Sequence, residues 1–391
     1  ADAVTGEHLY MLVVSADTTR LLRVASKGVS EAVKALNASV ISRDHERYVK
    51  AAHELHEMVI APVAPLLRKP ELLIIPDGEL HRVNFEALLS APADAGDFRR
   101  HLLLQRYAIA YLLSATTAVQ FSGLKQGRPT KALALAPGFS DELKQRYIAQ
   151  VKDSARLDRD FLGYVRQPFA LSTAQQLGEL LSATVMVGGE ADEKGFRAQA
   201  KDYGILHLGT HAELNEHAPM YSRLVLSKDG GSIEADADGY LHAYEIYEMD
   251  LRAQLAVLTA CETGAGSNVE GEGVRSLGYS FAYAGCPSLV TSLWEIDEKS
   301  SSEIIKRFYE HLADGMPKHV ALRQAKLEYL EDAGDELALP YYWAGMVLMG
   351  DVEPIEGAER GWSVMTMMAM VAIGLALIWL AWAYLRRRPH S

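Results

Sequence analysis

Short apolar runs alternate with helical patterns between residues 131 and 350. The runs lie at 132–136, 184–187, 205–208, 224–226, 255–259 and 287–293. Each is bounded by Gly, Asp or other polar residues, which is typical of strands buried on both faces of a parallel sheet. The helical patterns between them place apolar residues on one stripe, as after Ser300 and Glu303, which form a capping-box pattern. We therefore expect an open α/β fold: a mostly parallel sheet with helices on both faces.

The chain before residue 131 has a different pattern. It contains strand-like runs at 10–14 and 21–24, two helical stretches and the phrase LLIIPDGELHRVNFEALL at 72–89, whose Pro-Asp-Gly indicates a tight turn. The sequence thus predicts an N-terminal α/β part at 1–130 and a larger α/β domain at 131–352.

An uncharged apolar stretch occupies residues 361–385. As a helix it would exceed the roughly 30 Å of a bilayer's hydrocarbon core. Aromatic residues lie near both of its ends, where amphipathic rings favour the headgroup region. The pattern predicts an acidic linker at 353–361, a transmembrane helix at 362–385 that contacts the lipid bilayer, and a basic tail at 386–391.

The charges beside this stretch bear on its orientation. Arg386, Arg387 and Arg388 follow it, whereas the preceding flank is acidic, so the positive-inside rule places the C-terminus in the cytoplasm and favours an extracytoplasmic domain. No export signal precedes Leu9, so a cytoplasmic domain on a single-pass tail anchor remains open. A start at Ala1 indicates a processed chain or one that begins partway along a longer polypeptide.

Composition narrows the function further. Lys plus Arg number 39 against 51 for Asp plus Glu, a formal charge of -12, which argues against a broad surface for nucleic acid. The two cysteines, Cys261 and Cys286, are too few for a disulfide scaffold or a cysteine-rich metal site. Chemistry on sulfur must therefore come from a single residue.

Candidate chemistry follows two of the predicted strands. Functional groups in open parallel sheets gather beyond the carboxyl ends of strands. His211 follows the strand at 205–208, and Cys261 follows the strand at 255–259. If these strands are neighbours, the imidazole can activate the thiol as a nucleophile. The backbone N–H groups of Ala212 and Cys261 are then candidate donors to an oxyanion.

Simpler interpretations compete with this one. A cysteine that ends a buried strand is often a small core residue, and we expect that role for Cys286. His207, inside its strand, is expected to be a hydrogen-bonded core residue. The spacing of His207 and His211 lacks an H-E-x-x-H context and a carboxylate at ligand spacing, so we expect neither a metal nor another cofactor.

Several phrases resemble the CHAT family of caspase-like and separase-like cysteine peptidases. LHLGTHAE, at 206–213, is similar to its histidine motif. LTACETGAG, followed by GEGVRSLGYSFAYAGCPSLVTSLWEIDEKSS, is similar to its cysteine motif and continuation. The phrase at 72–89 and the closing PYYWAGMVLMGD also resemble the family, so the likeness covers most of residues 70–352.

The resemblance implies a caspase-like fold and a Cys-His dyad that hydrolyses peptide bonds in protein substrates, with His211 and Cys261 at the catalytic positions. Ala212 departs from the family, which usually has glycine there. Family members often carry upstream helical repeats that act as substrate-recruiting or regulatory parts. The start at Ala1 fits a chain separated from such repeats.

Acidic residues near the cysteine bear on substrate choice. Glu295 and Asp297 are candidates for a pocket that binds a basic residue before the scissile bond, although an acidic residue also suits a helix N-terminus. Two other classes of function stay open: a catalytically silent scaffold that binds proteins, and a sensor that responds through the thiol of Cys261.

Overall fold

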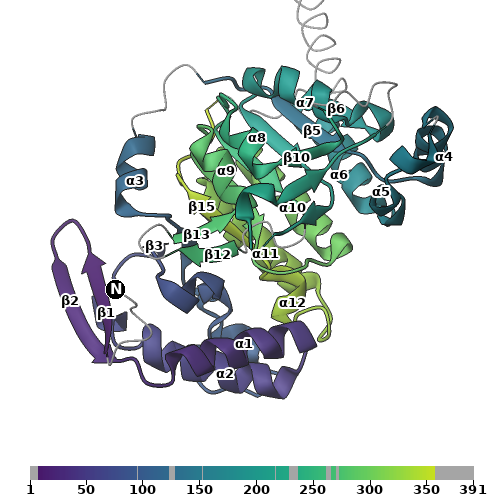
Figure 1. Ribbon diagram of the computed structural model, residues 1–391. Coiled ribbons are helices and arrows are strands. Elements are labelled where there is room, and N and C mark those ends of the chain that lie inside the picture. The colour runs from purple at the N-terminus through teal and green to yellow at the C-terminus, as the bar shows by residue number, and fades with distance from the viewer. Residues whose placement is uncertain are drawn as a thin grey trace, which may run out of the picture.

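The computed structural model describes residues 8–94, 96–122, 128–151, 153–215, 217–228, 237–260, 266–269 and 273–356. Its centre is a sheet of eight strands, around which helices and smaller sheets are arranged (Figure 1).

The N-terminal part begins with an antiparallel hairpin, formed by β1 (His8–Val14) and β2 (Thr19–Ala25). Both strands cover the runs expected at 10–14 and 21–24. Two helices follow, α1 (Val29–Ser42) and α2 (His45–Val59), which pack against each other beside the hairpin (Figure 1). Asp44 begins α2, because its carboxylate accepts a hydrogen bond from the backbone N–H of Arg47 at 3.1 Å.

The central sheet takes strands from both sides of residue 130. In spatial order they are β3 (Glu71–Ile74), β4 (Ala108–Tyr111), β15 (Met346–Gly350), β14 (Ser288–Ser292), β11 (Leu255–Leu258), β7 (Ile205–Leu208), β5 (Ala132–Ala136) and β6 (Thr184–Val187). Only β14 and β15 pair antiparallel in this sheet. The prediction of a mixed α/β fold with a mostly parallel sheet is confirmed.

Helices cover both faces of this sheet, as the sequence predicts. Side chains alternate along each strand, so Ile205 and Leu206 of β7 enter two different hydrophobic clusters. The helices on the Ile205 side include α6 (Pro168–Leu181), α10 (Glu298–Ala313) and α11 (Lys318–Asp332). Those on the Leu206 side include α7 (Glu193–Gln199), α8 (Ala243–Tyr247) and α9 (Leu277–Tyr283).

Smaller elements, besides short 3-10 turns, complete the described chain. They are the helices α3 (Ala115–Ser122), α4 (Asp141–Gln150), α5 (Arg159–Gly163) and α12 (Pro340–Trp343), and the short strands β8 (Ala212–Glu213), β9 (Arg223–Val225), β10 (Tyr240–His242), β12 (Gly266–Val269) and β13 (Gly273–Ser276). The run at 224–226, expected in the parallel sheet, instead belongs largely to β9 of a three-stranded antiparallel sheet with β8 and β10. An apolar run alone does not tell which sheet buries it.

The predicted membrane location is corrected. Within the residues that the structure describes, no helix is both long and apolar enough to cross a bilayer. The longest of the described helices, α10, has 16 residues. At 1.5 Å per residue it measures about 24 Å, short of the roughly 30 Å of a hydrocarbon core. The expected span at 362–385 and the tail at 386–391 lie outside the described residues, so the predictions of bilayer contact and sidedness are withdrawn.

Candidate functional site

The two strands that carry the candidate dyad lie side by side. β7 and β11 are parallel and in register, with Leu208 opposite Leu258. His211 is the third residue after Leu208, and Cys261 is the third residue after Leu258. Because parallel strands end at the same edge of a sheet, this register leads the chain to both positions from neighbouring points on one edge.

The described chain stops one residue before the candidate nucleophile. Ala260 is buried, and its carbonyl oxygen accepts a hydrogen bond from Ser292 Oγ of β14 at 2.6 Å. Cys261 lies outside the described residues, so its role and that of its N–H stay predictions. The structure thus places Ala260, the residue directly before Cys261.

His211 is partly buried and held through one ring nitrogen. Its Nε2 lies 2.9 Å from the carbonyl oxygen of Val165. A carbonyl oxygen only accepts, so Nε2 carries the proton, and in the neutral ring Nδ1 keeps its lone pair. Burial lowers the pKa of His211 below its ordinary value, and the charge of Lys144 lowers it further. The arrangement favours a neutral imidazole that can accept a proton at Nδ1.

Two aromatic rings contact this imidazole. The ring of Tyr164 stacks on His211 with centroids 5.2 Å apart and planes at 23°, and the ring of Phe139 lies at 4.9 Å. Phe139 is the third residue after β5, so it repeats the offset of His211 after β7. Its φ of 49° is left-handed, a strained conformation that is uncommon for non-glycine residues and that clusters at functional sites.

Tyr164 is itself held by a polar network. Its hydroxyl donates a hydrogen bond to Glu213 of β8. The same carboxylate pairs with Arg223 of β9 at 2.6 Å, and the Arg223 guanidinium lies over the ring of Tyr240 at 3.5 Å. Burial and the hydrogen bond to Glu213 raise the pKa of Tyr164, so the phenol keeps its proton. The stacking partner of His211 is thus held by a carboxylate that is itself paired with Arg223.

The structure also places Ala212, the predicted oxyanion donor. Val225 N–H donates to the carbonyl of His211 at 2.9 Å, and Ala212 lies opposite Leu224. Bonded and non-bonded pairs alternate along antiparallel strands, so the N–H of Ala212 points away from β9. Ala212 is not among the described non-glycine residues with positive φ. Alanine therefore fits this position without the backbone freedom of glycine.

The two acidic residues predicted for a substrate pocket differ in their surroundings. Glu295 is exposed. Asp297 is the N-cap of α10, since its carboxylate accepts a hydrogen bond from Ser300 N–H at 2.8 Å. The alternative interpretation, a helix N-terminus, therefore accounts for Asp297, and α10 begins before the predicted capping box at Ser300.

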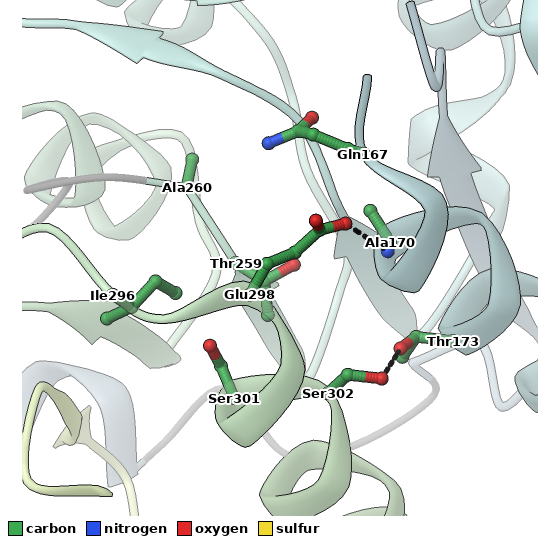
Figure 2. Close-up of a pocket in the computed structure, with 9 residues that line it drawn as sticks. All are labelled: Gln167, Ala170, Thr173, Thr259, Ala260, Ile296, Glu298, Ser301 and Ser302. Carbon is green, nitrogen blue, oxygen red and sulfur yellow. Dashed lines mark hydrogen bonds between the residues drawn. The ribbon is translucent and has the colours of Figure 1, made fainter. Parts of the chain in front are cut away.

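A small cavity of about 40 Å³ opens beside Ala260, between the N-termini of α6 and α10. Figure 2 shows Gln167 and Glu298 on its wall. The Glu298 carboxylate accepts hydrogen bonds from the N–H groups of Phe169 and Ala170, at 2.8 and 2.9 Å, and so caps α6 from another helix. Burial raises the pKa of this carboxyl group.

Gln167 is the other polar residue of the cavity wall. It is 9% exposed, and its Oε1 is a buried acceptor without a hydrogen-bond partner among the described residues. The residue is followed by Pro168, the first residue of α6. Sequence reasoning missed both Gln167 and Glu298, because nothing in the order of residues tells that α6 and α10 meet at their N-termini.

His207 and Cys286 occupy the core, as predicted. Burial lowers the pKa of His207 to about 3, so the ring stays uncharged, and its Nδ1 lies 3.3 Å from the hydroxyl of Tyr309. Cys286 is fully buried, and burial raises the pKa of its thiol to about 11. Neither residue is suited to acid–base or nucleophilic chemistry at neutral pH.

Comparisons with known proteins bear on the site. A family model described as CHAT domain matches residues 49–351. No curated protein matches the chain. Among solved structures, the Saccharomyces cerevisiae separase–securin complex contains a chain that is 12% identical to this one, with a TM-score of 0.40. The match covers 69% of this chain and 14% of that chain. The chain therefore spans only a small part of the separase chain.

Two further solved structures are similar at this level. The Arg-specific cysteine proteinase gingipain R is 8% identical to this chain, with a TM-score of 0.45. The match covers 79% of this chain and 68% of the proteinase chain. A complex of the Porphyromonas gingivalis RgpB pro- and mature domains is 9% identical with a TM-score of 0.43, covering 84% and 77%.

Proposed function

Since the chain belongs to the CHAT domain family, we propose that it is a caspase-like cysteine endopeptidase that hydrolyses peptide bonds in proteins. Cys261 is the nucleophile of this proposal and His211 is its base. The observation that carries it is the register of β7 and β11, in which the two residues follow paired positions by the same number of residues.

The state of His211 supports the role of a base. Its Nε2 proton is engaged by the carbonyl oxygen of Val165, which leaves Nδ1 as the accepting nitrogen. The lowered pKa of His211 keeps the ring neutral at physiological pH. A neutral imidazole within reach of a thiol can take its proton as the sulfur attacks.

In the proposed reaction the thiol proton of Cys261 passes to Nδ1 of His211 while the sulfur bonds to the carbonyl carbon. The oxyanion that forms accepts hydrogen bonds from the N–H groups of Ala212 and Cys261. The C–N bond then breaks, and the imidazolium gives its proton to the leaving amine. Water, deprotonated by His211, hydrolyses the thioester and releases the acid and the free thiol.

Selection of the residue before the scissile bond belongs to the same proposal. Glu295 is the exposed carboxylate near the start of α10, so it is the available partner for a basic side chain of a substrate. Asp297 is occupied as a helix cap. A protein is thus the proposed partner, and we expect Glu295→Gln to weaken cleavage after basic residues more than after neutral ones.

A peptide library tests the function. The wild-type chain should cleave a subset of its peptides, and both Cys261→Ala and His211→Ala should abolish this cleavage. Cys286→Ala is the matched control, because that thiol is buried and its substitution leaves the proposed dyad intact. Cleavage that survives Cys261→Ala would reject the assignment, and a folded wild-type chain that cleaves no peptide or protein would favour a binding role.

A further inference from the structure

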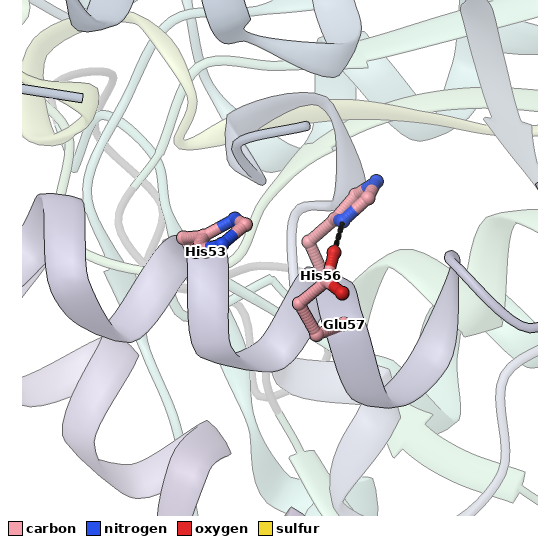
Figure 3. Close-up of side chains that lie close together, drawn as sticks. All are labelled: His53, His56 and Glu57. Atoms are coloured by element: carbon pink, nitrogen blue, oxygen red, sulfur yellow. Dashed lines mark hydrogen bonds and ion pairs between the residues drawn. The ribbon is translucent and has the colours of Figure 1, made fainter. Parts of the chain in front are cut away.

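Three potential metal ligands lie on one turn of α2. His53, His56 and Glu57 have the i, i+3, i+4 spacing that places side chains on one face of a helix. One ligand atom from each side chain lies within 4.8 Å of the other two. Figure 3 shows the two imidazole rings and the carboxylate gathered on this face. Elsewhere among the described residues no comparable group of three occurs.

A hydrogen bond of His53 determines which of its ring nitrogens can coordinate a metal ion. Its Nδ1 lies 3.1 Å from the carbonyl oxygen of Leu89, and since that oxygen only accepts, Nδ1 carries the proton. Nε2 then keeps the lone pair that a metal ion needs. Histidine ligands in metalloproteins commonly donate their other ring N–H to a backbone carbonyl in this way, which fixes the tautomer and the ring direction.

His56 and Glu57 supply the second and third ligands. His56 Nδ1 and Glu57 Oε1 are 3.0 Å apart. Two ligands of a tetrahedral Zn²⁺ ion, each about 2.0–2.1 Å from the metal, are about 3.4 Å apart. A dication can therefore take the place of the shared proton after a small movement of Glu57, whose side chain is 55% exposed.

The surroundings suit a partly desolvated ion with an open side. The His56 side chain is 8% exposed, whereas Glu57 faces solvent. The two imidazole rings are nearly parallel, at 15°, with centroids 6.3 Å apart. Lys50, the cation one turn earlier, pairs with Glu54 at 3.9 Å. Imidazole nitrogen with a single carboxylate suits Zn²⁺ and similar transition metals, whereas Ca²⁺ and Mg²⁺ prefer oxygen ligands.

From this geometry we propose that His53, His56 and Glu57 bind a transition-metal dication of the Zn²⁺ class, with water completing the coordination. The ion lies on the turn at 53–57, beside the segment that contains η3 (Phe85–Ala87) and Leu89, which α2 already contacts through the Tyr48 hydroxyl and the Ala87 carbonyl at 2.7 Å and through His53 and Leu89. The site is separate from His211 and Cys261 and does not depend on the proposed peptidase activity.

Titration with CoCl₂ and ZnCl₂ tests the site. A thiol beside His211 would also bind these ions, so the full-length chain carries Cys261→Ala. We expect the visible d–d absorption of tetrahedral Co²⁺ to saturate at one equivalent and to disappear when Zn²⁺ displaces Co²⁺. Zn²⁺ should also raise the melting temperature of this chain.

Substitutions on α2 identify the ligands. His53→Ala and Glu57→Gln should each weaken Zn²⁺ binding by at least the roughly 10–100-fold that loss of an outer-shell partner costs. Glu54→Gln, on the same helix, should leave Zn²⁺ affinity unchanged. Both ligand substitutions avoid the buried His56, and circular dichroism checks that the variants fold. The proposal is overturned if the chain binds no Zn²⁺, or if Glu54→Gln weakens binding as much as the ligand substitutions do.

Discussion

The stacking of Tyr164 on His211 leads to a quantitative prediction about catalysis. Tyr164→Ala removes the ring that lies 5.2 Å from the imidazole centroid and the hydroxyl that donates to Glu213. Glu213 keeps its pair with Arg223, so no carboxylate is left unpaired. The variant therefore loosens the orientation of His211 without leaving an isolated charge.

The size of the effect follows from the contact. An aromatic pair of this kind is worth about 0.5–1.5 kcal/mol beyond its buried area. If that free energy holds the imidazole in its reactive orientation, kcat falls by about 2- to 13-fold. Tyr164→Phe keeps the ring and should keep kcat within about twofold. KM should change little in both variants.

The pH profile separates positioning from a general loss of structure. Burial is the largest cause of the lowered pKa of His211. Opening the site in Tyr164→Ala should raise this pKa, and because the base must be neutral, the acid limb of kcat should move to higher pH. Tyr164→Phe should leave the limb in place.

Peptide hydrolysis between pH 4 and 9 by wild type and both variants is the assay. Tyr221→Ala is the control, because Tyr221 is 61% exposed and contacts His242 and Tyr244 instead of His211. Equal losses in Tyr164→Phe and Tyr164→Ala would show that the hydroxyl matters and the ring does not. An unchanged kcat and acid limb in Tyr164→Ala would refute the reasoning.

Three further predictions concern charge. Lys144→Met removes a charge that lowers the pKa of His211, so the acid limb of peptide hydrolysis should move to higher pH; a move to lower pH would contradict this. Lys326→Met leaves the buried carboxylate of Glu86 without its partner, which should cost about 3–5 kcal/mol in urea unfolding, and adding Glu86→Gln should restore part of the loss. Burial raises the pKa of Glu193 from 4.5 to about 7. The protonated Glu193 carboxyl group therefore contributes fully to the free energy of unfolding below pH 4.5, and this contribution is lost as pH rises through 7. Glu193→Gln should flatten the fall of the urea midpoint between pH 5 and 8, and parallel curves would contradict this.

The positions of His211 and Cys261 were within reach of sequence reasoning, whereas the adjacency of β7 and β11 was only a condition, which the structure meets. Both are short apolar runs that end before Gly209 or a polar residue, and the carboxyl-end rule for parallel sheets then points to His211 and Cys261. The same rule applied to the run at 132–136 would have found Phe139, which lies at the same offset after β5.

Contacts that depend on the path of a loop were not predictable in this way. Val165 and Tyr164 reach His211 from a segment between α5 and α6, and no local pattern indicates that this segment passes beside His211. Glu298 was missed for a similar reason. It caps a helix more than a hundred residues earlier in the chain, so only the packing of α6 against α10 reveals its role.

The rate at which Cys261 is alkylated tests the central claim most directly. Iodoacetamide should modify one residue of the native chain, since the Cys286 thiol is fully buried and its pKa is raised to about 11. If the imidazole of His211 takes the proton of the Cys261 thiol, His211→Ala should slow the alkylation of Cys261 at neutral pH by about tenfold or more. Equal rates in the two chains would contradict the account.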